Sequence, residues 1–213
     1  LTKQTIHMEK IIEHKNNFDN KGTILVNTSD VVHPLSEDDI NQLNLFCEKV
    51  DKEYISIGDA GESNNLLVGR FMTDIEKPLV VENPYSEKVI KILSQEKVIK
   101  FIKKILNIDE EVFLRRVQFN QIDKDCFVGY HLDTDSNPDY LAAGVIQLGK
   151  NYKGGLYRVY QKNNSYFDYK STFGDLIISN CNYPHEVTKV LDGERKSLVF
   201  FISNNSGKNN RKK

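Results

Sequence analysis

The spacing of apolar residues changes at about residue 112, and this change constrains the fold more than any other feature. From there on, apolar and polar residues alternate with a period of two, because successive side chains of a strand point to opposite faces. Five strand-like runs follow one another: VFLRRVQFNQI, LAAGVIQLG, GLYRVYQ, DLIISN and SLVFFIS. Turn-forming segments such as NYKGG and LDGER separate them. Short strands at this spacing predict an antiparallel sandwich or barrel.

The first half of the chain has mainly helical patterns. The segment PLSEDDINQLNLFCEKVDKEY predicts a helix with Ser36 as N-cap and Asp39 three residues on. Residues 86–106 predict one amphipathic helix, residues 22–32 a strand and residues 58–65 a loop. We therefore expect an α+β, mainly β chain. Residues 1–111 would pack their helices on one sheet without forming an independent domain, residues 112–203 would form the β body, and residues 204–213 a disordered basic tail.

Composition and charge exclude several functional classes. The 213 residues are 39% hydrophobic, which is ordinary for one globular domain. Formal net charge is −1 and the tail SNNSGKNNRKK is basic, so the remaining chain is mildly acidic and we expect no nucleic-acid partner. No apolar run approaches the roughly 18 residues of a membrane span. Three cysteines without CxxC spacing favour a reducing compartment, and we expect a cytoplasmic protein.

A polar cluster follows one of the strand-like runs, in FVGYHLDTDSNPDYL. His131 and Asp133 are two residues apart, so a strand would point both to one side. Of the five histidines, His185 also lies at a strand edge of the β body. Two imidazoles and one carboxylate form the facial arrangement of non-haem Fe(II) oxygenases. The alternative interpretation of His131 and Asp133 is a polar turn between strands.

Two further groups of polar residues lie on predicted strands. Arg195 and Ser197 share a face, and no acid in KSLVFFIS could neutralise a buried Arg195, so an anionic ligand is expected. The alternative is a surface arginine paired with Glu194. Gln118 and Asn120 share the polar face of the strand before the His131 segment. They could contact a bound cosubstrate, or they could belong to the solvent-facing side of an edge strand.

Taken together, these motifs resemble a known family. YHLD, YKGGLYRVY, FGDLIISN and PHEVTKVLDGERKSLVFFIS are similar to the iron(II)- and 2-oxoglutarate-dependent dioxygenases, with the prolyl-4-hydroxylase-like catalytic domain as the closest likeness. The likeness covers about residues 112–203. It implies a double-stranded β-helix, a cupin-like jelly roll. It also implies three ligands for Fe(II): His131, Asp133 and His185.

The same resemblance implies that Arg195, assisted by Ser197, binds the distal carboxylate of 2-oxoglutarate. Many relatives have a tyrosine near the position of Gln118 and Asn120, so the contacts of these two residues depart from the family pattern. The implied reaction consumes O₂ and 2-oxoglutarate, releases succinate and CO₂, and hydroxylates a C–H bond. Ascorbate is expected as a possible reductant.

The expected substrate is an amino-acid side chain, free or in a peptide, and neither nucleic acid nor membrane is expected as a partner. Two alternatives use the same ligands: a non-catalytic metal-binding jelly roll and a zinc hydrolase. Asp135 and Asp139 follow the H-x-D motif in a predicted loop at the mouth of the site. If this loop faces the substrate, its acids favour a cationic side chain such as lysine or arginine; otherwise they are solvated.

Overall fold

The computed structural model describes residues 1–212, which form a mainly β fold with four α-helices. The helices are α1 (Lys3–Lys21), α2 (Glu37–Lys49), α3 (Ser86–Leu93) and α4 (Glu96–Leu106). The strands before residue 112 are β1 (Thr23–Val26), β2 (Lys52–Ile57), β3 (Ser63–Asp74) and β4 (Pro78–Val80). The later strands are β5 (Phe113–Ile122), β6 (Phe127–His131), β7 (Tyr140–Gln147), β8 (Tyr152–Gly154), β9 (Tyr157–Tyr160), β10 (Tyr166–Tyr169), β11 (Leu176–Asn180), β12 (His185–Val187), β13 (Val190–Gly193) and β14 (Arg195–Ser203). A 3₁₀ turn, η1 (Asp133–Asp135), follows β6.

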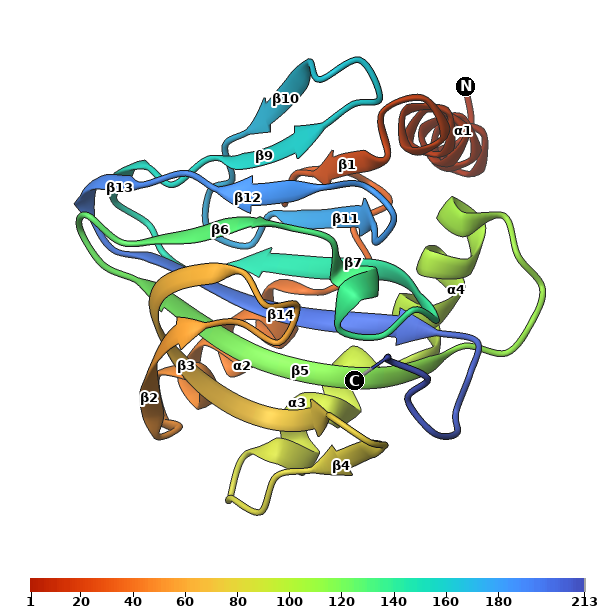
Figure 1. The fold of residues 1–213 in the computed structure, drawn as a ribbon. Helices are drawn as coiled ribbons and strands as arrows, with labels where there is room; N and C mark the ends of the chain where they lie inside the picture. The colour runs from red at the N-terminus through yellow and green to blue at the C-terminus, as the bar shows by residue number, and fades with distance from the viewer. Residues whose placement is uncertain (213) are drawn as a thin grey trace.

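The strands fold into two facing layers of antiparallel sheet. Hydrogen bonding runs in the order β1-β11-β7-β14-β5-β3-β6-β12-β9-β10, with β2 and β4 paired to β3 (Figure 1). Because β3 pairs with both β5 and β6, it connects the larger layer to the smaller one. Apolar side chains from both layers, among them Val68, Val145, Val159 and Val187, fill the space between them. The predicted jelly-roll fold is confirmed.

The helices cover the outer face of the larger sheet. In Figure 1, α2 and α3 lie behind β5 and β14, on the side away from β6 and β12. A second apolar core fills this interface, with Leu43, Leu93 and Ile102 from the helices and Phe119 and Phe200 from the sheet. Over the described residues 1–212, the helices contribute no side chain to the apolar core between the two sheets. The inner faces of the sheets are therefore where a site can form.

The predicted helix at Ser36 is confirmed, whereas the single helix over residues 86–106 is wrong. Ser36 and Asp39 form a capping box at the start of α2. Residues 86–106 form two helices, α3 and α4, because the backbone becomes extended at Gln95 (φ −56°, ψ 143°). The Gln95 side chain stabilises this break, since its Nε2 donates to the carbonyl oxygen of Ile92 at 2.9 Å and to Asp39 Oδ1 at 3.2 Å.

Residues before 112 contribute more of the sheet than the change in sequence pattern indicated. β3 begins at Ser63, inside the segment expected to be a loop, and its register with β5 places Leu67 opposite Gln121 and Met72 opposite Val117. β1 adds an edge strand beside β11. The β body is therefore built from both halves of the chain.

The C-terminal segment packs on the body, which does not fit the expected disordered tail. Asn209 is 3% exposed, and its Nδ2 donates to the carbonyl oxygens of Asp74 and Ser136 at 2.9 and 3.0 Å. The side chains of Asn205 and Asn210 donate to Asp139 Oδ2. A polar, asparagine-rich composition predicts disorder, but here the amide groups donate to backbone carbonyl and carboxylate acceptors of the body.

The three cysteines, Cys47, Cys126 and Cys181, are free thiols. Within residues 1–212, no helix combines the length and the apolar character required to cross a bilayer.

Candidate metal centre

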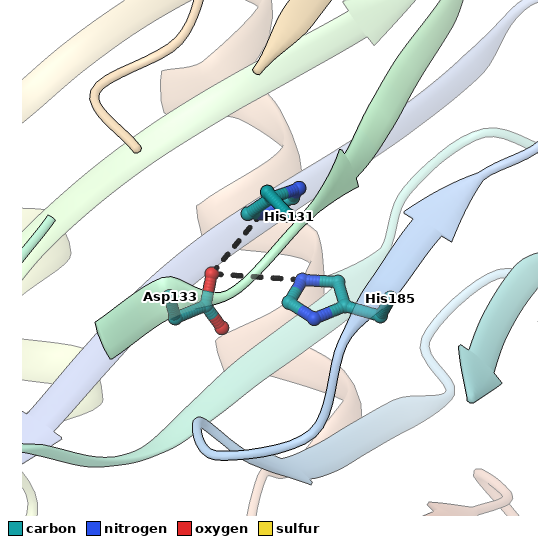
Figure 2. Close-up of side chains that lie close together, drawn as sticks. All are labelled: His131, Asp133 and His185. Atoms are coloured by element: carbon teal, nitrogen blue, oxygen red, sulfur yellow. Dashed lines mark hydrogen bonds and ion pairs between the residues drawn. The ribbon is translucent and has the colours of Figure 1, made fainter. Parts of the chain in front are cut away.

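Three side chains expected to bind a metal converge between the two sheets. His131 is the last residue of β6, Asp133 begins η1, and His185 is the first residue of β12. β6 and β12 pair with His185 opposite His131, which brings the two rings within 4.3 Å of each other, centroid to centroid. Figure 2 shows one Asp133 oxygen facing both rings, and Asp133 Oδ1 lies 3.2 Å from His131 Nε2 and 3.5 Å from His185 Nε2. The polar-turn interpretation is therefore insufficient.

The surrounding backbone orients both imidazoles. His131 Nδ1 lies 2.7 Å from the carbonyl oxygen of Gly129, and His185 Nδ1 lies 3.1 Å from that of Tyr183. A ring that donates from Nδ1 presents the lone pair of Nε2, which is how metal-binding histidines are commonly held. Asp133 is 4% exposed, and its Oδ2 is buried without a hydrogen-bond partner. Two Nε2 atoms and a carboxylate with a free oxygen fit a divalent transition metal.

Burial and mutual charge set the protonation of these groups. Burial lowers the pKa of His185, and the neighbouring charge of His131 lowers it further. Burial would also lower the pKa of His131, but the hydrogen bond and the charge of Asp133 outweigh it and raise this pKa to about 9. Burial would raise the pKa of Asp133, but the two histidines hold it below its ordinary value. Because a metal ligand must be deprotonated, a metal ion bound here would displace the proton of His131.

Arg195 lies in the same cavity and lacks an ionic partner. It is 2% exposed, and Ser197 beside it is fully buried. Its Nη1 donates to Ser197 Oγ at 3.2 Å, while its Nε is buried without a partner. Among residues 1–212, no carboxylate lies within ion-pair distance of this guanidinium; Glu194 instead pairs with Lys196. The alternative of a surface Arg195 paired with Glu194 is therefore wrong.

Gln118 and Asn120 lie on the inner face of β5 and line the cavity. Arg116 donates from Nε and Nη2 to Gln118 Oε1, at 3.0 and 2.6 Å, and Gln118 Nε2 donates to Asn120 Oδ1 at 2.8 Å. In the pairing of β5 with β14, Asn120 is opposite Ser197. The alternative of a solvent-facing polar side is wrong for this strand, because β3 and β14 flank it.

The chain is similar to known proteins in both sequence and structure. Residues 117–203 match the 2OG-Fe(II) oxygenase superfamily. The chain is also similar to an oxidoreductase of the 2OG-Fe(II) oxygenase family from Burkholderia pseudomallei, with 31% sequence identity and a TM-score of 0.87 over 95% of this chain and 94% of that one. The chain belongs to the 2OG-Fe(II) oxygenase family. The predicted family and the predicted enzyme class are thus confirmed.

More distant structures share the fold. A prolyl-4-hydroxylase from Pseudomonas putida has 16% identity and a TM-score of 0.62, over 91% of this chain and 98% of that one. A prolyl hydroxylase from Trichoplax adhaerens, in complex with a hypoxia inducible factor peptide, has 14% identity and a TM-score of 0.67, over 93% and 90%. No curated protein matches the chain.

The cavity of this oxygenase has a volume of about 80 Å³ and extends beyond the metal site towards the loop between β2 and β3. Asp59, Glu62 and Arg70 line it on that side. These residues belong to no motif in the sequence, and only the pairing of β3 with β5 and β6 brings them to the site.

Asp135 and Asp139, by contrast, are not among the residues that line the cavity. Asp135 is exposed, and Asp139 accepts hydrogen bonds from the C-terminal asparagines. The expectation that these two acids face the substrate is not supported, and the interpretation as solvated or structural acids holds for this loop.

Proposed function

We propose that this oxygenase holds Fe(II) with His131, Asp133 and His185, binds 2-oxoglutarate through Arg195, and hydroxylates a C–H bond of an amino-acid side chain, free or in a peptide. One observation carries the proposal. The same cavity contains the buried Arg195 guanidinium, whose Nε lacks a partner, and the Asp133 carboxylate, whose buried Oδ2 lacks a partner beside two imidazoles. A metal ion together with a dicarboxylate would satisfy both.

His131, Asp133 and His185 would hold Fe(II) with three ligand atoms, and 2-oxoglutarate and O₂ would bind at the same metal. Bound Fe(II) supplies the chemistry that activates O₂. In the overall reaction, one oxygen atom enters the substrate C–H bond and the other enters succinate, while 2-oxoglutarate loses CO₂. The chain contributes orientation and the exclusion of water, since Asp133 and His185 are buried between two sheets and His131 is partly buried.

Arg195 would pair with the distal carboxylate of 2-oxoglutarate. A guanidinium donates two parallel hydrogen bonds to a carboxylate, and its unpartnered Nε is available for one of them. Ser197 Oγ accepts from Nη1 and so fixes the plane of the group. Asn120 uses Oδ1 to accept from Gln118, which leaves its amide N–H groups for the cosubstrate.

Two other functions use the same three ligands. A zinc hydrolase or a non-catalytic jelly roll would give no role to a buried Arg195 without an anion, and burying such a charge is costly. The hydroxylase proposal gives this residue a ligand. Its extension to amino-acid side chains is supported by the prolyl hydroxylases among the structures that share the fold. Ascorbate is proposed as the reductant that keeps the iron ferrous.

Anaerobic titration with Fe(II), with and without 2-oxoglutarate, tests the proposal. We expect a weak visible charge-transfer band that requires both, and release of succinate when O₂ is admitted. His185→Ala should abolish the band and the turnover while the far-UV circular dichroism stays native. A His185→Ala variant with wild-type turnover, or succinate-independent hydrolysis with Zn(II), would contradict the assignment. The oxidised product is then sought by mass spectrometry as a gain of one oxygen.

A further inference from the structure

Glu62 is a carboxylate of the cavity that lacks a basic partner. It is partly buried, and among residues 1–212 no lysine, arginine or histidine lies within 4 Å of its carboxylate oxygens. Its oxygens accept hydrogen bonds from the Ala60 amide at 3.1 Å and from Asn64 Nδ2 at 3.0 Å. These neutral donors orient the carboxylate without neutralising its charge.

The Glu62 carboxylate is held in place from several sides. Asn64 is 9% exposed, and its Oδ1 accepts a hydrogen bond from the Gly129 amide at 3.2 Å. Gly129 in turn contacts His131 Nδ1 through its carbonyl oxygen. A Cβ on Gly58 would overlap with Glu62 Oε1, so the absence of a side chain there leaves room for the carboxylate. Glu62 is thus connected through Asn64 to the strand of a metal ligand.

The other charges that line the cavity are compensated. Arg116 Nη2 lies 2.6 Å from Asp59 Oδ2, and Arg70 Nη1 lies 3.9 Å from the same oxygen. Arg70 Nε also donates to Glu53 at 3.1 Å. Under the proposed function, a divalent metal and Arg195 balance Asp133 and the two carboxylates of 2-oxoglutarate. Glu62 then remains as the negative charge without a partner.

Glu62 lines the same cavity as His131, Asp133 and His185. Part of the wall of this cavity is aliphatic: Ile55, Leu66, Val68 and Val128 line it. An anionic end and an apolar wall together match a flexible side chain with a methylene stem and a cationic head.

We propose that the substrate of this oxygenase carries a cationic side chain of the lysine or arginine type, whose ammonium or guanidinium group pairs with Glu62 while its methylene stem lies along the apolar wall towards the metal. This inference rests on the proposed function. It transfers the preference for a cationic substrate from the loop acids Asp135 and Asp139 to a residue that lines the cavity.

The test compares substrates that differ only in side-chain charge. Capped peptides with arginine or citrulline, and with lysine or norleucine, are offered to the wild type and to Glu62→Gln. This variant keeps the size of the side chain and one acceptor oxygen, which can still accept from Asn64 Nδ2. Asp135→Asn is the matched control, because it removes an exposed acid outside the cavity. Binding is followed anaerobically as a perturbation of the charge-transfer band, and turnover is followed by mass spectrometry.

We expect the wild type to prefer a cationic peptide over its neutral partner. Glu62→Gln should lower kcat/KM for that peptide on the order of tenfold to a hundredfold, the usual effect of losing a charge-assisted hydrogen bond, and leave neutral peptides unchanged. Asp135→Asn should behave as the wild type. Equal use of charged and neutral peptides, no binding of either cationic peptide, or a Glu62→Gln variant that keeps the preference would overturn the inference.

A measurement without peptide tests the proposed function separately. The charge-transfer band formed by Fe(II) and 2-oxoglutarate should be the same in wild type and Glu62→Gln before any peptide is added. If the band forms in both proteins without a cationic preference, the substrate inference alone is wrong. If no band forms in the wild type, the proposed function is wrong, and the inference about Glu62 fails with it.

Discussion

Two buried arginines on neighbouring strands differ in their partners: one has a carboxylate within the described chain and the other has none. Arg115 of β5 is fully buried and donates to both oxygens of Asp74, at 2.8 and 2.9 Å, and to the carbonyl oxygens of Asn205 and Gly207. Arg195 of β14 is equally buried, but it donates to a serine and leaves its Nε without a partner. A charge satisfied within the chain contributes to the fold, whereas one left without a counter-ion indicates a ligand.

The Arg115–Asp74 pair also supports the segment from Asp133 to Tyr140, here called the metal loop because it begins at a candidate metal ligand. Asp74 Oδ2 accepts from Asn137 Nδ2 and from Tyr140 Oη, both at 2.9 Å, and these residues belong to the segment that follows Asp133. Asn209 of the C-terminal segment donates to the backbone of Asp74 and Ser136. The Arg115–Asp74 pair thus connects β3, β5, the metal loop and the chain end.

The largest effect is expected from breaking the satisfied pair. Asp74→Ala leaves the Arg115 guanidinium buried without an anion, which should cost about 3–5 kcal/mol of the free energy of unfolding. Urea denaturation of the metal-free protein measures this loss. The control Asp135→Asn, at an exposed position, should stay within about 0.5 kcal/mol of the wild type. A loss below about 1 kcal/mol in Asp74→Ala would mean that water reaches Arg115.

Arg195→Met should have the opposite effect on stability. Because this guanidinium already lacks an anion, an apolar side chain of similar length should leave the metal-free protein equally stable, or more stable by about 1–4 kcal/mol. The affinity for 2-oxoglutarate should fall on the order of tenfold or more, since each lost charge-assisted hydrogen bond is worth roughly 1.5–3 kcal/mol. Urea denaturation and the anaerobic 2-oxoglutarate titration give the two values. Destabilisation as large as in Asp74→Ala would show that Arg195, too, is a structural ion.

The smallest effect is expected at Asp39, a partly exposed carboxylate with satisfied hydrogen bonds. Burial would raise its pKa, but the hydrogen bonds from Lys97 and Ser36 outweigh this and lower it. A lowered pKa in the folded state stabilises the protein above the unfolded pKa of about 3.9, and this stabilisation is lost as the pH falls through the folded value. Asp39→Asn should cost about 1 kcal/mol at pH 7, a typical capping contribution.

The pH dependence of stability shows whether Asp39 acts through its charge or through its side-chain geometry. The difference in unfolding free energy between wild type and Asp39→Asn should begin to narrow as the pH falls below the unfolded pKa of about 3.9, and its charge-dependent part should be lost once the pH is below the lowered pKa of the folded state. Asp38→Asn, one residue earlier and exposed, serves as the control. A difference that stays constant from pH 7 to acid would assign the loss to altered side-chain geometry and not to the charge.

Local patterns and motif spacing made part of this molecule predictable. Ser36 and Asp39 predicted a helix start, because capping acts over three residues. The strand argument for His131 and Asp133 was wrong in detail, because β6 ends at His131 and Asp133 lies in η1, yet the two side chains and His185 converge as the resemblance implied. Each of these signals is contained in a short stretch of sequence.

Other features depend on contacts between distant segments. The alternation of β3 is interrupted between Arg70 and Met72, where its register with β5 shifts, so its sequence does not show a clean period of two. The pairing of Arg115 with Asp74 and the position of Glu62 leave no local pattern, because they arise only when β3 packs beside β5 and β6. The asparagines of the C-terminal segment have disorder-prone composition, and only their acceptors on the body explain their order.

The pairing of β6 with β12 has a consequence for refolding. His131 faces His185 in one register only, and a slip of β12 by one residue would place Glu186 opposite His131 and turn the His185 imidazole to the other face of the sheet. Collapsed molecules with a misaligned smaller sheet would therefore lack the metal site even if their secondary structure content is native. Stoichiometric metal uptake thus counts correctly aligned molecules, and the yield of a refolding experiment can be scored before any substrate is known.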